Sequence, residues 1–150
     1  MRYIRRIKEV PVFSNSFGTL YNDDVEGLNN TRGKYLRWQW SEDGVIIVPV
    51  ANNKFALGRM FRYPPYREFL EFPGGGIKPG ETIIDAAKRE LGEELSLFAN
   101  SIEIVGKIYP DTGILSKAIN VAIAYLSEEN KLENTNNSIE PMEYIDKDVV

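Results

Sequence analysis

The 150-residue chain contains neither cysteine nor histidine. Without them it can form no disulfide, no Ser-His-Asp or Cys-His catalytic arrangement and no conventional zinc site. Any acid–base or metal chemistry must therefore use carboxylates, whose oxygens favour hard cations such as magnesium, manganese or calcium. The lack of cysteine also suits a reducing compartment, so we expect a cytoplasmic protein.

Long apolar runs and an excess of positive charge are missing as well. The longest apolar stretch, residues 45–51, is too short to span a bilayer, and basic residues interrupt the first ten positions where a signal peptide would be apolar. The formal net charge of −4 argues against a nonspecific nucleic-acid binder. With 43% hydrophobic residues, the chain is long enough for one domain and too short for two ordinary ones.

Short runs of alternating apolar and polar residues, separated by turn residues, predict strands along much of the chain. We expect them at residues 4–13, 18–23, 35–40, 45–50, 55–61, 102–109 and 118–126. The pairs Asp43-Gly44 and Asn52-Asn53 are suited to turns. A polar stretch at 127–137 predicts a loop, and Tyr144-Ile145 predicts a last strand.

After a glycine and proline cluster at 73–80, the spacing becomes helical from Thr82 to Leu97. Thr82 and Asp85 match a capping box at the start of this helix. Its apolar residues recur on one face, which we expect to pack on a sheet: Ile83, Ile84, Ala87, Leu91 and Leu95. A helix beside a mixed sheet indicates an α/β or α+β domain.

Three glutamates share the opposite face of this helix: Glu90, Glu93 and Glu94. A charged helix face is usually just solvated, and like charges at this spacing destabilise a helix by roughly 0.2–0.5 kcal/mol per pair. The wider context favours a functional interpretation. Residues 75–94 follow the pattern G-x5-E-x7-R-E-U-x-E-E, where U is aliphatic, and six fixed positions would match by chance in only about one chain in 10⁵.

This pattern resembles the Nudix box, with Ser96 in place of the last glycine of the box. The resemblance implies a Nudix fold, in which helices sandwich a mixed β-sheet, and a hydrolase that cleaves pyrophosphate linkages with Mg²⁺ or Mn²⁺. It implies that the catalytic residues are Glu90, Glu93, Glu94 and Arg89, and that the metal ligands are the three glutamates and the backbone carbonyl of Gly74. Serine takes the left-handed backbone of a helix end at a cost of about 1 kcal/mol, so we expect a structural departure only.

The acidic face also makes physical sense as a metal site. A divalent cation would remove the repulsion between the glutamates and lower the pKa of a bound water for attack on phosphorus. Arg89 suits a pairing with Glu81 or Glu93, because a guanidinium fork binds carboxylates in a bidentate way. The general base stays open among four residues, of which the last three lie in the expected loop: Glu93, Glu128, Glu129 and Glu133.

Three further stretches resemble ADP-ribose and ADP-sugar pyrophosphatases. Residues 59–64 and 71–75 are similar to R-Q-Y-R and E-L-P-A-G, and residues 109–113 are similar to the Y-P-S-P-G turn. Two positions depart from that subfamily, because Met60 replaces the glutamine and Lys117 stands where an acidic residue is usual. The resemblance implies that ADP-ribose or another nucleotide sugar is the substrate.

The same resemblance implies substrate contacts and an assembly. We expect contacts with the substrate from Arg62, Arg59 and Pro110. We also expect an antiparallel strand extension at residues 1–36, through which two copies form a homodimer, followed by the Nudix hydrolase domain at 37–150. Nudix domains usually carry a helix after their last strand, so a chain ending soon after Asp146 predicts a shortened form or a partner that covers the sheet.

Three alternatives stay open. The chain could hydrolyse nucleoside triphosphates or RNA ends, or it could be a catalytically silent Nudix module that senses a nucleotide. The intact glutamates favour an enzyme over a sensor. A purely structural interaction domain would leave the spacing of the metal ligands unexplained.

Overall fold

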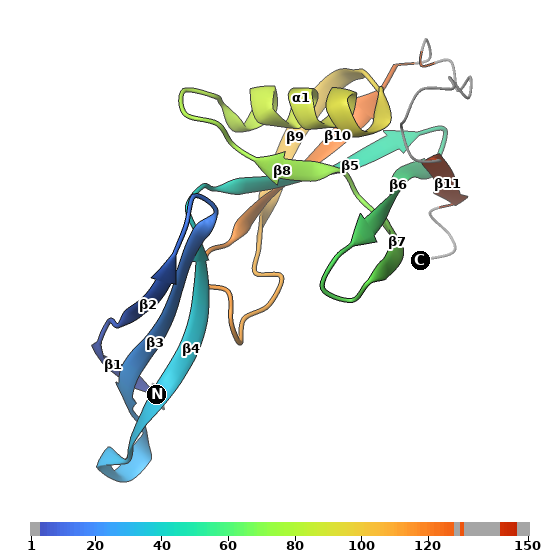
Figure 1. Cartoon of the computed structure of the whole chain (residues 1–150). Helices are drawn as coiled ribbons and strands as arrows, with labels where there is room; N and C mark the ends of the chain where they lie inside the picture. Colours follow the sequence, from blue (N-terminus) through green and yellow to red (C-terminus); the bar gives the residue numbers. More distant parts are fainter. Residues whose placement is uncertain (1–3, 128–129, 131–141, 147–150) are drawn as a thin grey trace. The chain divides into compact units, whose positions relative to one another are not determined.

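The computed structural model describes residues 4–127, 130 and 142–146 (Figure 1). The chain separates into two compact units, of which the first comprises Met1–Asp43 with Ile108–Ile119 and the second Gly44–Lys107 with Asn120–Val150. Within the described residues, no helix is both long and apolar enough to cross a membrane. The first unit holds a four-stranded sheet, and the second holds a larger sheet with an α-helix.

The sheet of the first unit is built around β3 (Gly18–Glu26), which pairs antiparallel along its whole length with β4 (Arg32–Trp40). A short 3-10 helix, η1 (Leu28–Asn30), joins these two strands. The other edge of β3 pairs with β1 (Arg5–Lys8) and β2 (Pro11–Ser14). We predicted one strand at 4–13, which was wrong.

The interruption between β1 and β2 has a polar cause. Val10 donates its backbone N–H to the Asp23 carboxylate at 3.0 Å, so this residue is bound by a side chain at the break. Arg37 donates its Nε to the same carboxylate at 2.7 Å, and its guanidinium lies 3.8 Å above the Tyr21 ring. A buried charge must be paired in this way to be tolerated, and Asp23 is only 2% exposed. This network fixes the register of three strands.

The segment Ile108–Ile119 also belongs to the first unit, where it docks on the edge of β4. The backbone N–H of Trp38 donates to the Ile114 carbonyl at 2.8 Å, and the Trp38 carbonyl accepts the backbone N–H of Ser116 at 3.0 Å. The Lys117 ammonium donates to Asp43 at 3.0 Å. Lys117, which departs from the subfamily pattern, therefore has a structural partner.

The sheet of the second unit has the strand order β11-β6-β5-β10-β9, and two short strands add to it, with β7 paired to β6 and β8 to β5. The strands are β5 (Gly44–Ala51), β6 (Lys54–Arg62), β7 (Arg67–Glu71), β8 (Gly74–Gly76), β9 (Ala99–Ile108), β10 (Ile119–Leu126) and β11 (Met142–Asp146). The turn at Asn52-Asn53 is confirmed, with φ of 49° and 63° at its two residues. Gly44 already begins β5, so the other expected turn lies just before it.

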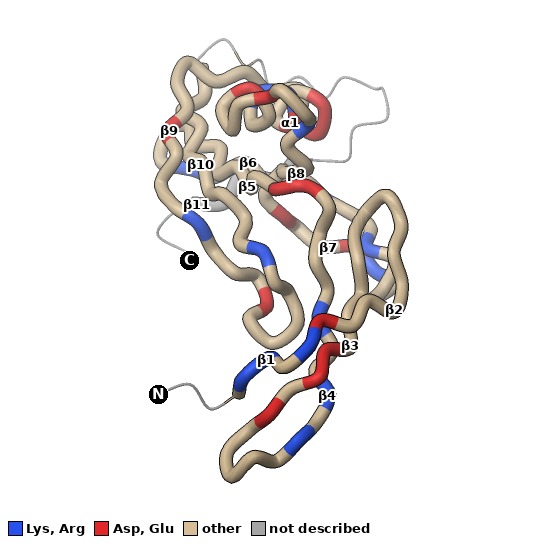
Figure 2. The backbone as a smooth tube through the Cα atoms, turned by 90° about the vertical axis from the view of Figure 1, so that its left-hand side faces the viewer, with Lys and Arg blue, Asp and Glu red and all other residues tan. Residues whose placement is uncertain are grey.

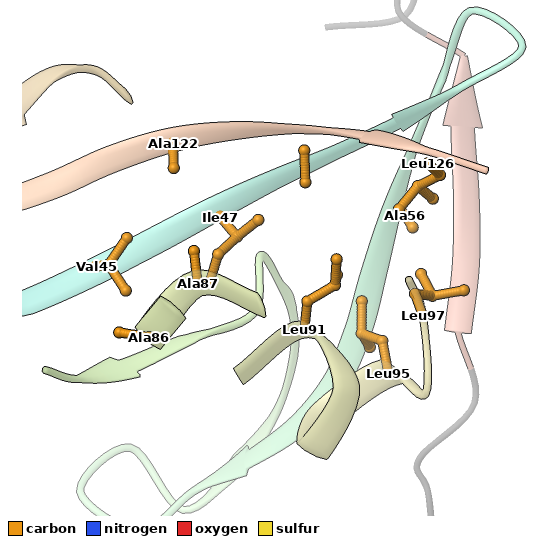
Figure 3. Packing of buried hydrophobic residues seen from close by; sticks show 11 residues of the cluster. Val45, Ile47, Ala56, Ala86, Ala87, Leu91, Leu95, Leu97, Ala122 and Leu126 are labelled. Carbon is orange, nitrogen blue, oxygen red and sulfur yellow. The ribbon is translucent and has the colours of Figure 1, made fainter. Parts of the chain in front are cut away.

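The single α-helix in the described part of the chain, α1 (Ile83–Leu95), packs on this sheet. Thr82 caps it as predicted, because its Oγ1 accepts the N–H of Asp85 at 3.1 Å. Figure 3 shows the buried side chains of α1 directed toward β5, β6 and β10. The buried apolar residues of the helix are Ala86, Ala87, Leu91 and Leu95. Ile84, expected in this stripe, is exposed instead.

Candidate active site

Arg89, near the middle of α1, connects the helix to the loop before it. Its Nε and Nη2 donate to the two carboxylate oxygens of Glu81 at 2.7 Å and 3.0 Å, and Nη2 also donates to the carbonyl of Gly76 at 2.9 Å. Its Nη1 donates to Glu90 at 2.6 Å and to Glu93 at 3.2 Å. The predicted pairing of Arg89 with Glu81 or Glu93 is confirmed for both partners, and Glu90 is a third.

Glu81 also binds the loop between β8 and α1, through Lys78. The Glu81 carboxylate accepts the backbone N–H of Lys78 at 2.9 Å, and the backbone N–H of Glu81 donates to the Lys78 carbonyl at 3.0 Å. The hydrogen bonds from Arg89 are the main reason why the pKa of Glu81 falls to about 2. The carboxylate is therefore ionised throughout the physiological pH range, and the turn before α1 stays tied to the helix.

Glu90 lies against the glycine-rich strand β8 and is only 9% exposed. A Cβ at Gly75 would collide with the Glu90 carboxylate, so any other residue there would displace this carboxylate. A charged helix face is usually solvated, and Glu90 departs from this rule because it is buried. Figure 2 marks in red the acidic positions along α1.

Glu94, one turn further on, accepts the backbone N–H of Gly74 at 3.0 Å. Burial is the largest influence on its pKa, which is raised above the usual value, and the negative charge of Glu90 acts in the same direction. The Gly74 N–H opposes this shift without cancelling it. Two partly buried carboxylates therefore repel each other beside the backbone of β8.

This donor set fits a hard divalent cation by its chemistry, because such a cation would relieve the repulsion between Glu90 and Glu94. Across the residues that the structure describes, no group of three or more acidic side chains stands ready to hold a metal. The contacts explain this result, because Arg89 engages Glu90 and Glu93, whereas Gly74 engages Glu94. The Glu93 side chain, which is 56% exposed, is the one most free to turn toward a cation.

A family model described as NUDIX domain matches residues 40–148. The chain belongs to the Nudix hydrolase family. It is 31% identical over 107 residues to ADP compounds hydrolase NudE of Escherichia coli (strain K12), a match that covers 71% of this chain and 58% of that protein. It is 24% identical over 142 residues to the ADP-ribose pyrophosphatase of Bacillus subtilis (strain 168), covering 95% of this chain and 75% of that one.

The Nudix fold is also found in a solved relative. A crystal structure of an ADP compounds hydrolase superposes with a TM-score of 0.73 at 26% sequence identity, and it covers 97% of this chain and 78% of that one. The predicted Nudix fold, a mixed sheet in the α+β class, is therefore confirmed. The chain spans little more than half the length of the E. coli relative.

The expected substrate contacts lie in three different places. Arg62 is bound by Glu71 on the hairpin of β6 and β7. Arg59 lies an odd number of residues away on the same strand, so it faces the opposite side of the sheet and would not contact the same group as Arg62. Pro110 belongs to the first unit. Of the four expected base candidates, Glu128, Glu129 and Glu133 lie outside the described residues.

The sequence did not predict the role of Glu71. Its carboxylate accepts hydrogen bonds from Arg62. After burial and the Gly74 N–H, the charges of Arg62 and Glu71 also affect the pKa of Glu94 in the Nudix box, the first lowering it and the second raising it. Glu71 stands in the E-F-P-G-G stretch that resembles the subfamily, but its partner depends on the register between β6 and β7. We predicted no strand at β7, so this contact could not be foreseen.

Proposed function

We propose that this Nudix protein hydrolyses a pyrophosphate linkage with Mg²⁺ or Mn²⁺ held by Glu90, Glu93, Glu94 and the backbone carbonyl of Gly74. The observation that carries the proposal is the set of contacts around Arg89, which hold the helix that bears the glutamates against the loop that leads from β8. Such rigid positioning of acidic ligands is what metal-assisted phosphoryl transfer requires.

Each residue of the site has its own role in this reaction. When bound, the cation would neutralise phosphate oxygens and lower the pKa of a water molecule. Glu93 is the exposed carboxylate of the helix face and the described candidate for accepting the proton of that water. Arg89 orients Glu90 and Glu93 through its Nη1. Arg62 supplies a positive charge for the diphosphate.

We infer that the substrate is a nucleoside diphosphate linked to a second group, with ADP-ribose or another nucleotide sugar as the leading candidates. The names of two relatives, an ADP compounds hydrolase and an ADP-ribose pyrophosphatase, support this class. A substrate with two bulky ends allows binding energy from both ends to orient the phosphorus for attack. A nucleoside triphosphate lacks the second group and should react more slowly.

The test is a panel of nucleotide sugars, dinucleoside polyphosphates and nucleoside triphosphates, incubated with and without Mg²⁺. We expect hydrolysis only with metal, and a higher kcat/KM for ADP-ribose than for any triphosphate. If triphosphates exceeded ADP-ribose and UDP- or GDP-sugars by about tenfold, equal to about 1.4 kcal/mol, the substrate class would be wrong while the metal chemistry remained. Binding of nucleotides without turnover would favour the silent sensor.

We also propose a homodimer formed through the sheet of the first unit. One face of this sheet carries an apolar group whose members are all at least partly exposed: Phe13, Leu20, Leu36, Trp38 and Trp40. Exposed apolar patches of this kind mark interfaces in soluble proteins. The division into a strand extension at 1–36 and a Nudix domain at 37–150 stays a prediction, and β4 crosses it.

A further inference from the structure

Arg62 is held by Glu71 in a bidentate fork on the hairpin of β6 and β7. Its Nε lies 3.0 Å and 3.2 Å from the two carboxylate oxygens of Glu71, and its Nη2 lies 2.6 Å from one of them. Both side chains keep part of their surface exposed. A fork fixes the orientation of a guanidinium more narrowly than a single hydrogen bond does. Glu71 therefore determines where the positive charge of Arg62 lies.

The strand register gives the direction of this fork. Glu71 pairs with Gly58, which lies four residues before Arg62 on β6, so the Arg62 side chain must run back along the hairpin. Gly58 and Arg62 point to the same face because side chains alternate along a strand. A Cβ at Gly58 would come within 3.0 Å of Leu95 on α1. The fork therefore lies on the face that the helix covers.

Glu94 lies next to Leu95 on α1, and Leu95 approaches Gly58, the residue that pairs with Glu71. Burial is the main reason why the pKa of Glu94 is raised, but the charge of Arg62 lowers it and the charge of Glu71 raises it. Among the described contacts, Glu94 bonds to the N–H of Gly74 and Arg62 bonds to Glu71. Glu94 is thus bound to the backbone three residues after Glu71, and the described ion pairs of Arg62 include Glu71 and not Glu94.

We propose that Glu71 is a positioning residue that keeps Arg62 from pairing with Glu94, which leaves Glu94 available to a divalent cation and Arg62 available to an anionic substrate. The inference rests on the proposed function, because it takes Glu94 as a metal ligand and a diphosphate as the substrate. An arginine and a carboxylate that can meet form a charge-assisted hydrogen bond. Once paired with Arg62, Glu94 would offer less negative charge to a cation.

The experiment measures Mn²⁺ binding to the full chain in the absence of substrate, by the loss of the free-ion electron paramagnetic resonance signal. Glu71→Ala should raise the Kd for Mn²⁺ by about tenfold, because it releases Arg62 toward Glu94. Glu71→Gln keeps an oxygen that can accept from Arg62, so its Kd should stay closer to the wild-type value. Adding Arg62→Ala to Glu71→Ala should restore most of the affinity.

Glu68 provides a matched control on the same strand. It lies three residues from Glu71, so it faces the opposite side of the sheet, and it pairs with Arg59 at 3.8 Å. Glu68→Ala removes the same charge as Glu71→Ala and should leave the Kd for Mn²⁺ unchanged.

Two results separate the failure of this inference from that of the proposed function. If the wild-type chain binds Mn²⁺ and the Kd of Glu71→Ala equals that of the wild type or of Glu71→Gln, Glu71 acts at most through its charge, and the positioning role is wrong. If the wild-type chain binds no Mn²⁺, the assignment of the metal site itself is wrong.

Discussion

The three acidic side chains of the helix face differ in their surroundings, so their removal should affect stability differently. Glu90 is 9% exposed and bonds to Arg89, whereas the Glu93 side chain is 56% exposed. We expect Glu90→Gln, Glu93→Gln and Glu94→Gln each to lower kcat by at least about a hundredfold at limiting Mg²⁺, because a lost ligand weakens charge stabilisation by several kcal/mol. Glu90→Gln should also lower the Tm.

Glu103 gives a control of the same chemistry at an exposed position on β9. Glu103→Gln should leave both turnover and the Tm unchanged, as measured by product release and thermal unfolding. Near-normal rates for all three variants of the helix face would show that the metal site has been assigned to the wrong residues.

Ser96 is a second residue whose conformation has a measurable consequence. It adopts a left-handed backbone, with φ of 53° and ψ of 33°, at the position where the Nudix box has glycine. A residue with a Cβ is strained there, so Ser96→Gly should stabilise the fold by about 1 kcal/mol. The measurement is chemical denaturation, and Ser127→Gly, just after β10, serves as the comparison for a serine outside this conformation. Equal or lower stability of Ser96→Gly would refute the strain argument.

The sheet of the first unit depends on a buried carboxylate, Asp23. Burial alone would raise the pKa of Asp23, but the hydrogen bonds from Arg37 and Val10 lower it below the usual value of 3.8. The unfolded chain therefore takes up this proton at a higher pH than the folded chain does. The stabilisation is complete above pH 3.8 and is lost as the pH falls through the folded pKa.

The corresponding variant is Asp23→Asn, which keeps the size of the side chain and removes its charge. We expect a lower free energy of unfolding at pH 7, because Arg37 loses its buried partner. We also expect a weaker dependence of stability on pH below about 4 than in the wild type. Urea unfolding at several pH values measures both effects. If the free energy of unfolding of Asp23→Asn fell with pH as steeply as that of the wild type, other carboxylates would control the acid sensitivity.

The strands and the helix with strong periodicity were predictable from the sequence. The apolar run in β5 and the four-residue spacing in α1 reflect burial against a single core, which a linear pattern records directly. The short strands β7 and β8 were missed. β8 consists of three glycines, which disfavour a strand by themselves, and it forms because β5 offers backbone partners.

The part of the candidate site that lies on one helix and its preceding loop was predictable from the sequence, whereas its contacts between strands were not. The Nudix box identified Glu81, Arg89 and the three glutamates, because their spacing along one helix and its preceding loop is a local property. The fork between Arg62 and Glu71 was not predictable, since it follows from pairing between two strands. The burial of Glu90 depends on Gly75 approaching from β8, which is again a tertiary contact.

The exposed apolar face of the first sheet predicts self-association of the chain. Phe13, Leu36 and Trp40 are all more than 40% exposed, and the strand register places them on one face with Trp38. A stable interface of standard size buries about 800 Å² on each partner, which a face of this composition can supply. We expect a particle of twice the 17.1 kDa mass of the chain in light scattering at micromolar concentration.

Two charge substitutions on β4 test whether this face forms the interface. Leu36→Glu places a carboxylate at a half-exposed position of the apolar face, so it should give a monomer, because a buried and unpaired charge is strongly unfavourable in an interface. Gly33→Glu adds the same charge on the opposite face of the same strand, where a Cβ meets only Val25 at 3.9 Å, and it should leave the dimer intact. A monomeric wild-type chain would refute the assembly. Dissociation by both variants would place the interface elsewhere on the sheet.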